Sequence, residues 1–449
     1  MTALPPPYSS MVSIAENMPP PTAPASIWKN RWIQLVFASL ATVMLANLQY
    51  GWTLFVNPMH DANHWSRTAI QVSFTVMIFL NTWLSPFEGW LVDRYGPRPV
   101  VVAGGMFAAL SWVLNSRAQS LQALYAGGAI GGLALGCVFG TCMGTALKWF
   151  PDKRGLAAGM IAAGYGLGAA ITSAPLSLMI KVSGYRHAFL FFGLLQGITI
   201  LVLGVLLVKP PSHVAVLAAR KSIYHGPELK PSQTIRTGVF WLTYLVYLLI
   251  AFGGMVMTAQ LGPIARDFGL ENRMITLLGV TAPVLTLAVS IDNFANGITR
   301  PIAGLISDIV GRENMMLLMF SLEAIALLGM AAVGRNPYGF LGFAALTFLF
   351  WGEIFVIFPA ICGDSFGVEN AAANNGLLYT AKGTAALAVP LASMLVAATG
   401  TWNSVLLAAS VSSLAAGLMA RFALVPMRKR MRDRAQLTVR VASELKPIW

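Results

Sequence analysis

The chain has 449 residues, of which 56% are hydrophobic and only 10% are charged. Soluble domains carry about 25% charged residues, so this composition excludes a soluble globular protein. The net charge of +13 would suit a nucleic-acid-binding protein, but the basic residues are distributed along the chain in a way that argues against nucleic acid as a partner.

The N-terminal residues 1–29 contain the sequence PPP twice and are expected to form a disordered cytoplasmic tail. They lack the positively charged start and the short apolar core of a cleaved signal peptide.

Apolar segments, most of them 20–28 residues long, follow this tail, and each can cross about 30 Å of hydrocarbon as a helix. They predict an all-α polytopic membrane protein with twelve transmembrane helices. In chain order the expected spans are 33–57, 69–92, 99–117, 121–147, 156–181, 187–208, 238–261, 279–306, 315–333, 338–362, 373–398 and 402–425.

The basic residues favour one side of the membrane. With the N-terminus inside, 21 of the 30 Lys and Arg residues lie in inner loops and tails, 7 lie in outer loops, and Arg300 and Lys382 lie within spans. This bias predicts that both termini are cytoplasmic. The protein is expected to reside in a bacterial inner membrane. The basic tail 426–449 is expected to lie against anionic lipid headgroups, so membrane lipid is an expected partner.

The two halves of the sequence match at a constant shift of 215 residues. The identities are Asn81 with Asn296, Pro86 with Pro301, Gly89 with Gly304, Asp93 with Asp308, Gly96 with Gly311, Gly168 with Gly383, and Pro175 with Pro390. Such a repeat predicts two six-helix bundles, residues 30–208 and 238–425, joined by a cytoplasmic linker at 209–237. A binding site between the bundles, near the middle of the membrane, is typical of transporters.

Two cations lie alone in apolar sequence. A positive charge at the bilayer centre costs about 2.5–3.5 kcal/mol on insertion scales, so Arg300 and Lys382 need a partner. The repeat places neutral Ser85 and Leu167 at the corresponding positions of the first half, which argues against a scaffold role. A bound anion would satisfy both charges. Arg300 and Lys382 are expected at similar depths, about 12 and 15 Å from the inner ends of their spans.

The neighbouring residues leave two roles open for nearby acids. Asn293, Asn296 and Arg300 form one polar stripe along the eighth span. Asp292 or Glu353 could pair permanently with Arg300 and make it a structural brace. The spacing of Trp351 and Phe355 turns Glu353 away from the site, whereas Asp292 stays open as a partner or as a proton carrier.

A loop signature occurs once in each half, as EGWLVDRYGPR and AGLISDIVGR. It resembles the signature of the major facilitator superfamily and implies the major facilitator fold. The residues at the signature positions are Asp93, Arg94, Gly96, Arg98, Asp308, Gly311 and Arg312. We expect a tight glycine turn beside each Asp, and a contact from the Asp to a helix N-terminus or to Arg154 that closes the inner face.

Within that superfamily the chain resembles the oxalate:formate antiporter family. The resemblance covers all twelve spans and is most specific in LANLQYGW, NGITRPIAGLISDIVGREN, FWGEIFVIFPAICGDSFG and NNGLLYTAKGTAALAVPL. It implies an oxalate site built from Arg300 and Lys382, with Gln49, Tyr50 and Trp351 around it.

Three aromatic positions expected to form the wall of the site depart from that family. Phe139 stands where a Tyr is expected, Phe355 replaces a second Tyr, and Tyr379 stands where a Trp can occur. A wall with fewer hydroxyl groups leaves anion binding in place and opens the site to a larger or singly charged carboxylate.

The sequence therefore predicts a secondary transporter of small carboxylates, oxalate in exchange for formate, that works by alternating access as a monomer. It is not expected to be an enzyme, and neither a cofactor nor a metal is implied. The alternatives are a proton-coupled monocarboxylate symporter that uses Asp292, or a membrane sensor that binds a carboxylate without moving it.

Overall fold

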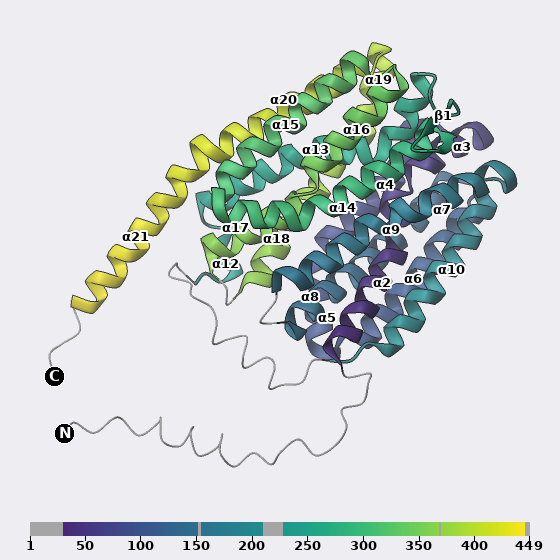
Figure 1. Cartoon of the computed structure of the whole chain (residues 1–449). Helices are drawn as coiled ribbons and strands as arrows, with labels where there is room; N and C mark the ends of the chain where they lie inside the picture. The colour runs from purple at the N-terminus through teal and green to yellow at the C-terminus, as the bar shows by residue number, and fades with distance from the viewer. Residues whose placement is uncertain (1–29, 151–153, 210–227, 368–369, 445–449) are drawn as a thin grey trace.

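The computed structural model describes residues 30–150, 154–209, 228–367 and 370–444. The predicted tail 1–29 and most of the linker 209–237 lie outside these residues. The described chain is helical apart from one short hairpin, so the predicted all-α class is confirmed (Figure 1).

The helices of the first half follow one another closely. They are α2 (Arg31–Tyr50), α3 (Thr53–Asn63), α4 (Arg67–Trp83), α5 (Ser85–Tyr95), α6 (Pro97–Arg117), α7 (Leu121–Leu135), a π-helical segment (Gly136–Gly140), α8 (Thr141–Trp149), α9 (Arg154–Ser183) and α10 (Tyr185–Leu206). Side-chain caps begin several of them, for example Asn30 at α2 and Ser66 at α4.

The second half begins with a short helix and contains the hairpin. Its elements are α12 (Pro231–Thr234), α13 (Gly238–Asp267), β1 (Met274–Leu277), β2 (Val280–Pro283), α14 (Val284–Val310), α15 (Arg312–Val333), α16 (Pro337–Trp351), α17 (Ile354–Phe366), α18 (Ala371–Ala386), α19 (Ala388–Thr399), α20 (Asn403–Met419), a second π-helical segment (Ala420–Leu424) and α21 (Val425–Glu444).

Several expected spans are not single straight helices. The first, second, tenth and eleventh are each divided, between α2 and α3, α4 and α5, α16 and α17, and α18 and α19. The bend between α4 and α5 is 49°. Hydropathy reports that a segment is apolar but not where its helix breaks, so the sequence could not reveal these divisions.

The ends of two spans also differ from expectation. Residues 279–283 were expected in the eighth span, but they belong to the hairpin, whose antiparallel strands pair Leu277 with Val280 and Met274 with Pro283. The twelfth span was expected to end at residue 425, but the helix continues as α21 to Glu444.

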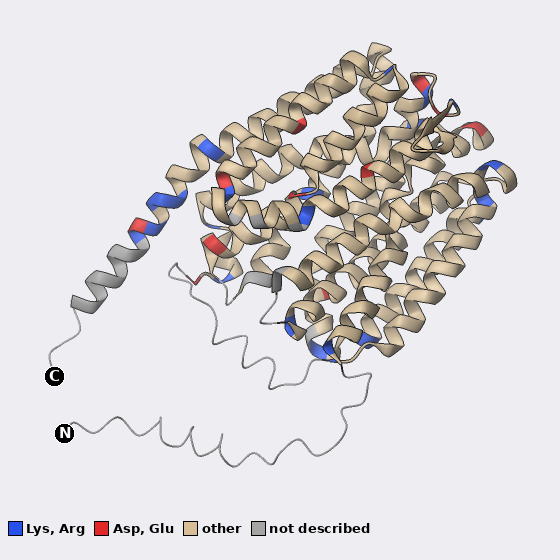
Figure 2. Ribbon diagram, in the orientation of Figure 1, with Lys and Arg blue, Asp and Glu red and all other residues tan. Residues whose placement is uncertain are grey.

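Ten helices of the described chain are long and apolar enough to cross a membrane, or eleven when α4 and α5 count as one span. The helix α14 is long enough but is not among these ten. Figure 2 shows the charged residues mainly near the two ends of the helices and along the first part of α21, with few in the middle.

The two halves meet along pairs of helices from opposite halves, α9 with α14 and α4 with α18. One close approach is at two glycines: a Cβ added to Gly166 would lie 2.8 Å from the Cα of Gly297. Small residues at this crossing let the backbones touch, as is common where membrane helices pack. The centre of this interface holds the two cations.

Candidate functional site

Arg300 lies on α14 and is completely buried. Its guanidinium donates to Asn296 Oδ1 from Nε (3.2 Å) and Nη2 (2.9 Å), to the hydroxyl of Tyr50 (3.1 Å), and to the backbone oxygen of Ala162 on α9 (2.5 Å). Tyr50 and Ala162 belong to the first half, so Arg300 bridges the two halves.

Lys382 lies on α18 and is also completely buried. Its Nζ donates to Gln49 Oε1 at 3.2 Å and to the Tyr379 hydroxyl at 3.1 Å. Gln49 is at the end of α2, next to Tyr50, so the two cations are held by neighbouring residues of one helix. Gln49 and Tyr50, which the family resemblance placed around the expected site, thus each contact one of the two cations.

Phe355 presents its ring to both cations. Its centroid lies 4.4 Å from Arg300 Cζ and 5.1 Å from Lys382 Nζ, and Trp351 contacts it edge to face at 5.5 Å. Tyr379 adds a second ring 5.3 Å from the ammonium. The negative face of each ring attracts the charge without neutralising it.

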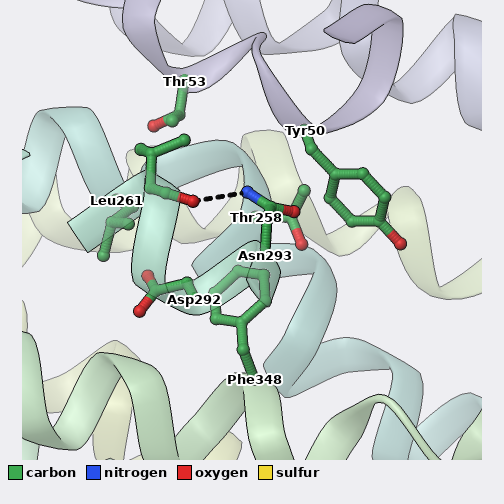
Figure 3. A pocket seen from close by; sticks show the side chains of 8 residues that line it. Tyr50, Thr53, Thr258, Leu261, Asp292, Asn293 and Phe348 are labelled. Carbon is green, nitrogen blue, oxygen red and sulfur yellow. Dashed lines mark hydrogen bonds between the residues drawn. The ribbon is translucent and has the colours of Figure 1, made fainter. Parts of the chain in front are cut away.

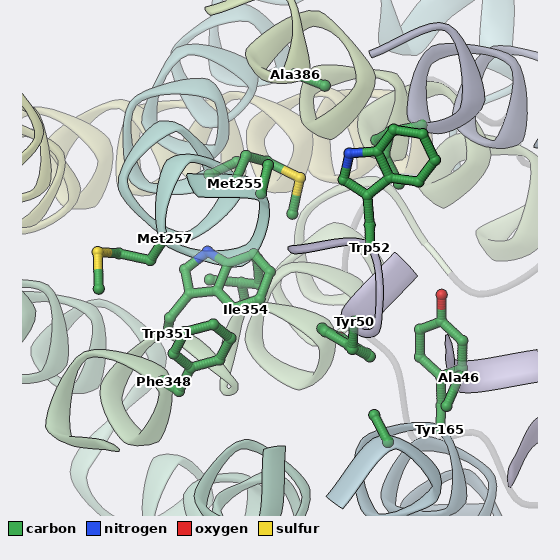
Figure 4. Close-up of a cluster of buried hydrophobic side chains, with 14 of the residues drawn as sticks. Ala46, Tyr50, Trp52, Tyr165, Met255, Met257, Phe348, Trp351, Ile354 and Ala386 are labelled. Carbon is green, nitrogen blue, oxygen red and sulfur yellow. The ribbon is translucent and has the colours of Figure 1, made fainter. Parts of the chain in front are cut away.

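Tyr165 on α9 completes the wall and was not singled out from the sequence. Its hydroxyl donates to Gln49 Oε1 at 3.0 Å, and its ring lies 5.2 Å from Tyr50 and 4.9 Å from Phe139. Phe139 thus reaches the site through Tyr165. The available signal was a lone aromatic in the small-residue sequence AAGYGLGAA. Figure 4 shows Tyr50, Tyr165 and Trp351 in one buried cluster.

The carboxylates considered as permanent partners do not contact the cations. Both side-chain oxygens of Asp292 and both of Glu353 lack a hydrogen-bond partner, although the two residues are fully buried. Among the described side chains, no carboxylate lies within ion-pair distance of Arg300 or Lys382. The two cations are therefore surrounded by neutral dipoles and aromatic rings.

A small cavity adjoins the site on the side of Asp292 (Figure 3). It has room for about one water molecule. Its lining comes from both halves: Tyr50, Thr53, Thr258, Leu261, Val289, Asp292, Asn293 and Phe348.

The loop signatures form the expected turns. Gly96 and Gly311 have φ of +83° and +94°, a conformation that glycine adopts without strain. The side chains of Asp93, Asp308 and Arg154 lie outside the described part, so the expected latch between them stays a prediction.

The arginines of the signatures make local contacts. The Arg94 guanidinium lies 5.4 Å from the Trp90 ring, and Arg98 Nε donates to Leu207 O at 3.4 Å. Arg312 lies 3.4 Å from Asp364, which belongs to the same half.

Ion pairs join the two halves at the end of the molecule that carries the hairpin. Arg266 of α13 contacts both oxygens of Asp61 of α3 at 2.7 Å, and Arg67 of α4 contacts Asp267 at 2.7 Å. Trp402 Nε1 also donates to Asp267 at 2.9 Å. The sequence placed the two arginines in outer loops without revealing these pairs.

Neutralising the hairpin-end ion pairs is expected to loosen this end only modestly. Each ion pair is partly exposed, and exposed ion pairs contribute about 0–1 kcal/mol. Asp61→Asn should therefore raise the fraction of molecules in which the two halves are separated at this end by about fivefold at most. Thiol labelling of a cysteine introduced at Thr53, in a background without the natural cysteines, measures the change. Unchanged labelling in the Asp61→Asn, Asp267→Asn double variant would show that the pairs do not hold this end shut.

Comparisons with known proteins match this architecture. A family model described as the Major Facilitator Superfamily matches residues 35–285 and 272–447. The oxalate:formate antiporter of Oxalobacter formigenes is 33% identical over 412 residues, which cover 91% of this chain and 95% of that protein. YhjX of Escherichia coli K12, described as an uncharacterized MFS-type transporter, is 24% identical over 365 residues, covering 80% and 87% of the two chains. Human monocarboxylate transporter 11 is 32% identical over 135 residues, 29% of each chain.

Proposed function

Because the chain belongs to the Major Facilitator Superfamily, whose members are transporters rather than enzymes, we propose that it exchanges small carboxylates, oxalate against formate, by alternating access. One observation carries this proposal. Arg300 and Lys382 are fully buried at the interface of the two halves, and among the described residues only neutral groups accept their hydrogen bonds or stack on them.

The chemistry of the two cations suits a dicarboxylate. The planar Arg300 guanidinium can donate two parallel hydrogen bonds to one carboxylate, and the Lys382 ammonium can take the other as a point charge. Phe355, which faces both cations, limits the size of the guest between them. Oxalate, whose two carboxylates are directly bonded, is the smallest dicarboxylate and supplies one negative charge to each cation.

The same charges give a reason for obligatory exchange. Two cations in a low-dielectric site repel each other, and burying them costs free energy that neutral dipoles only partly recover. A dianion neutralises both, so a loaded carrier closes and reorients more readily than an unloaded one. Formate would neutralise one charge, and its exchange for oxalate would move net charge across the membrane.

The membrane placement belongs to the same proposal. We place the protein in a bacterial inner membrane as a monomer, with both termini in the cytoplasm. The exposed basic residues in the first turns of α21, Lys429, Arg430 and Arg432, would then meet anionic headgroups at the inner surface.

Counterflow in reconstituted liposomes tests the function. Labelled oxalate should accumulate in liposomes loaded with oxalate or formate and not in unloaded ones, and heteroexchange should generate a membrane potential. Competition by C1–C4 carboxylates then defines the substrate, and the apolar Phe139 and Phe355 should let larger or singly charged carboxylates compete. Binding of labelled oxalate without accumulation would instead favour a sensor.

Asp292 supports a second candidate, proton-coupled symport of a monocarboxylate. Its carboxyl is fully buried without a hydrogen-bond partner, and it lines the small cavity beside Tyr50, which bonds Arg300 (Figure 3). An isolated acid inside a membrane protein is a reasonable proton carrier.

Asp292→Asn separates the two candidates. For an antiporter, this variant is expected to keep most of its oxalate exchange in the absence of a proton gradient, because no bond to either cation is lost. The measurement is counterflow with and without an imposed gradient, with Glu88→Gln, another buried acid, as the matched control. Wild-type uptake that requires the gradient and is abolished by Asp292→Asn would favour the symporter.

A further inference from the structure

Two buried acids lie together in the second half, away from the bonds of the two cations. Gly352 and Glu353 lie between α16 and α17, and Glu323 is in the middle of α15. Both are 0% exposed. They approach α13 at adjacent residues, because a Cβ added to Gly253 would meet the Glu323 carboxylate and one added to Gly254 would meet the ring of Trp351, two residues before Glu353.

This acid pair lacks a cationic partner among the described side chains. Three of its four carboxylate oxygens, Oε1 and Oε2 of Glu353 and Oε2 of Glu323, have no hydrogen-bond partner. The fourth, Glu323 Oε1, accepts from Ser413 Oγ of α20 at 3.4 Å. The nearby backbone of α13 is at Gly253, where a Cβ would lie 2.8 Å from the same oxygen, so glycine leaves space for this side chain.

The surrounding elements contribute little that could balance two negative charges. From α16 the neighbour is Trp351, whose Nε1 is buried without a partner. Tyr247 of α13 stacks on Phe358 of α17, and Arg300 of α14 is held by Asn296 and Tyr50.

Elementary electrostatics requires protons at such a pair. Two neighbouring carboxylates that are both ionised in a low-dielectric interior repel each other and have lost their hydration, which costs far more than keeping them neutral. Interacting acids of this kind take up and release protons as a unit. We propose that Glu323 and Glu353 form an intramembrane proton-binding site in the second bundle, distinct from the anion site.

The position of Glu353 connects this proton site to the aromatic wall. Its backbone oxygen accepts from Val356 N (2.8 Å) and Ile357 N (2.9 Å), so it starts the helix α17 at the break of the tenth span. Trp351 lies just before the break and Phe355 just after it. Ionisation of Glu353 would draw water or hydrogen-bond donors toward the break between α16 and α17. This would shift the ring of Phe355, which faces both cations.

The internal repeat separates the shared scaffold from this added feature. At the shift of 215 residues, Trp351–Phe355 corresponds to the π-helical segment Gly136–Gly140, so both halves have irregular backbone at this point. Irregular turns of this kind are frequent at functional sites. The acids are not shared, because Glu353 corresponds to Val138 and Glu323 to Ala108.

Infrared spectroscopy of the purified protein tests the site independently of transport. At neutral pH, the wild-type protein should show an absorption band of protonated carboxyl groups, and this band should move to lower frequency in heavy water. Part of the band should be missing from the spectrum of the Glu323→Gln, Glu353→Gln double variant. Glutamine has nearly the shape of a protonated glutamate, so the variant should fold. Lost intensity from ionised carboxylates instead would overturn the proposal.

Exchange measurements test the link to the aromatic wall, and this part rests on the proposed function. Wild-type oxalate exchange should slow as rising pH ionises the pair, because the new negative charge weakens anion binding. Glu353→Gln should retain most of the exchange and lose that pH dependence, while Glu88→Gln should keep the wild-type profile. A Glu353→Gln profile identical to that of the wild type would refute the link. If the wild type exchanges no carboxylate at any pH, the proposed function fails, and the infrared comparison still decides the proton site.

Discussion

Replacing Arg300 with glutamine is expected to abolish oxalate exchange. The variant loses the planar group that can hold one carboxylate by two hydrogen bonds, and Lys382 alone cannot neutralise a dianion. Truncating one partner of a buried charge pair costs about 2–5 kcal/mol, which corresponds to binding weakened about 30-fold to a few thousand-fold. The initial rate of labelled oxalate counterflow at fixed protein content measures the loss.

Two further variants make the Arg300 result specific. Arg300→Lys keeps the charge without the planar fork, and it should recover only part of the activity. Arg335→Gln removes an exposed arginine that stacks on Phe268 away from the site, and it should leave exchange unchanged. Near-wild-type exchange by Arg300→Gln would contradict the proposed site.

Replacing Lys382 with glutamine is expected to abolish oxalate exchange as well, with a different effect on formate. The ammonium bonded to Gln49 and Tyr379 is lost, and Arg300 remains as a single cation with its bonds to Asn296 and Tyr50 intact. One cation matches a monoanion. Formate self-exchange should therefore fall less than oxalate exchange, and the ratio of the two rates is the quantity to measure.

The control for Lys382 is another lysine on a spanning helix. Lys181, near the end of α9, is exposed, so Lys181→Gln should leave both rates unchanged. Equal losses of formate and oxalate exchange in Lys382→Gln would mean that the lysine supports the fold rather than one carboxylate. Thermal unfolding of the purified variant would then show reduced stability.

The sequence predicted the centre of the candidate site because charge stands out in apolar surroundings. Arg300 and Lys382 are conspicuous for that reason, and their neutral counterparts in the repeat argued against a scaffold role. The structure brings them to one ring, that of Phe355, and to adjacent residues of α2, Gln49 and Tyr50.

Contacts that depend on how helices cross could not be predicted in the same way. Tyr165 reaches Gln49 because α9 packs against α2, and the sequence contains no charge or spacing that marks this contact. The ion pair of Arg266 with Asp61 joins segments 205 residues apart, so it depends on the complete fold. The breaks at Leu84 and Glu353 occur within apolar segments, where the hydrophobic pattern is uninformative.

The helix from Asn403 to Glu444, which continues through the π-helical segment Ala420–Leu424, makes the twelfth span a long rod that extends beyond the bundle. Its C-terminal portion, α21, has 20 residues and extends in line with α20 away from the other helices (Figure 1). At 1.5 Å per residue it is about 30 Å long, so a tilt of about 10° in the second bundle would displace its tip by about 5 Å. A fluorophore attached there would report each turnover of a single molecule as a change in energy transfer to a dye on the first bundle.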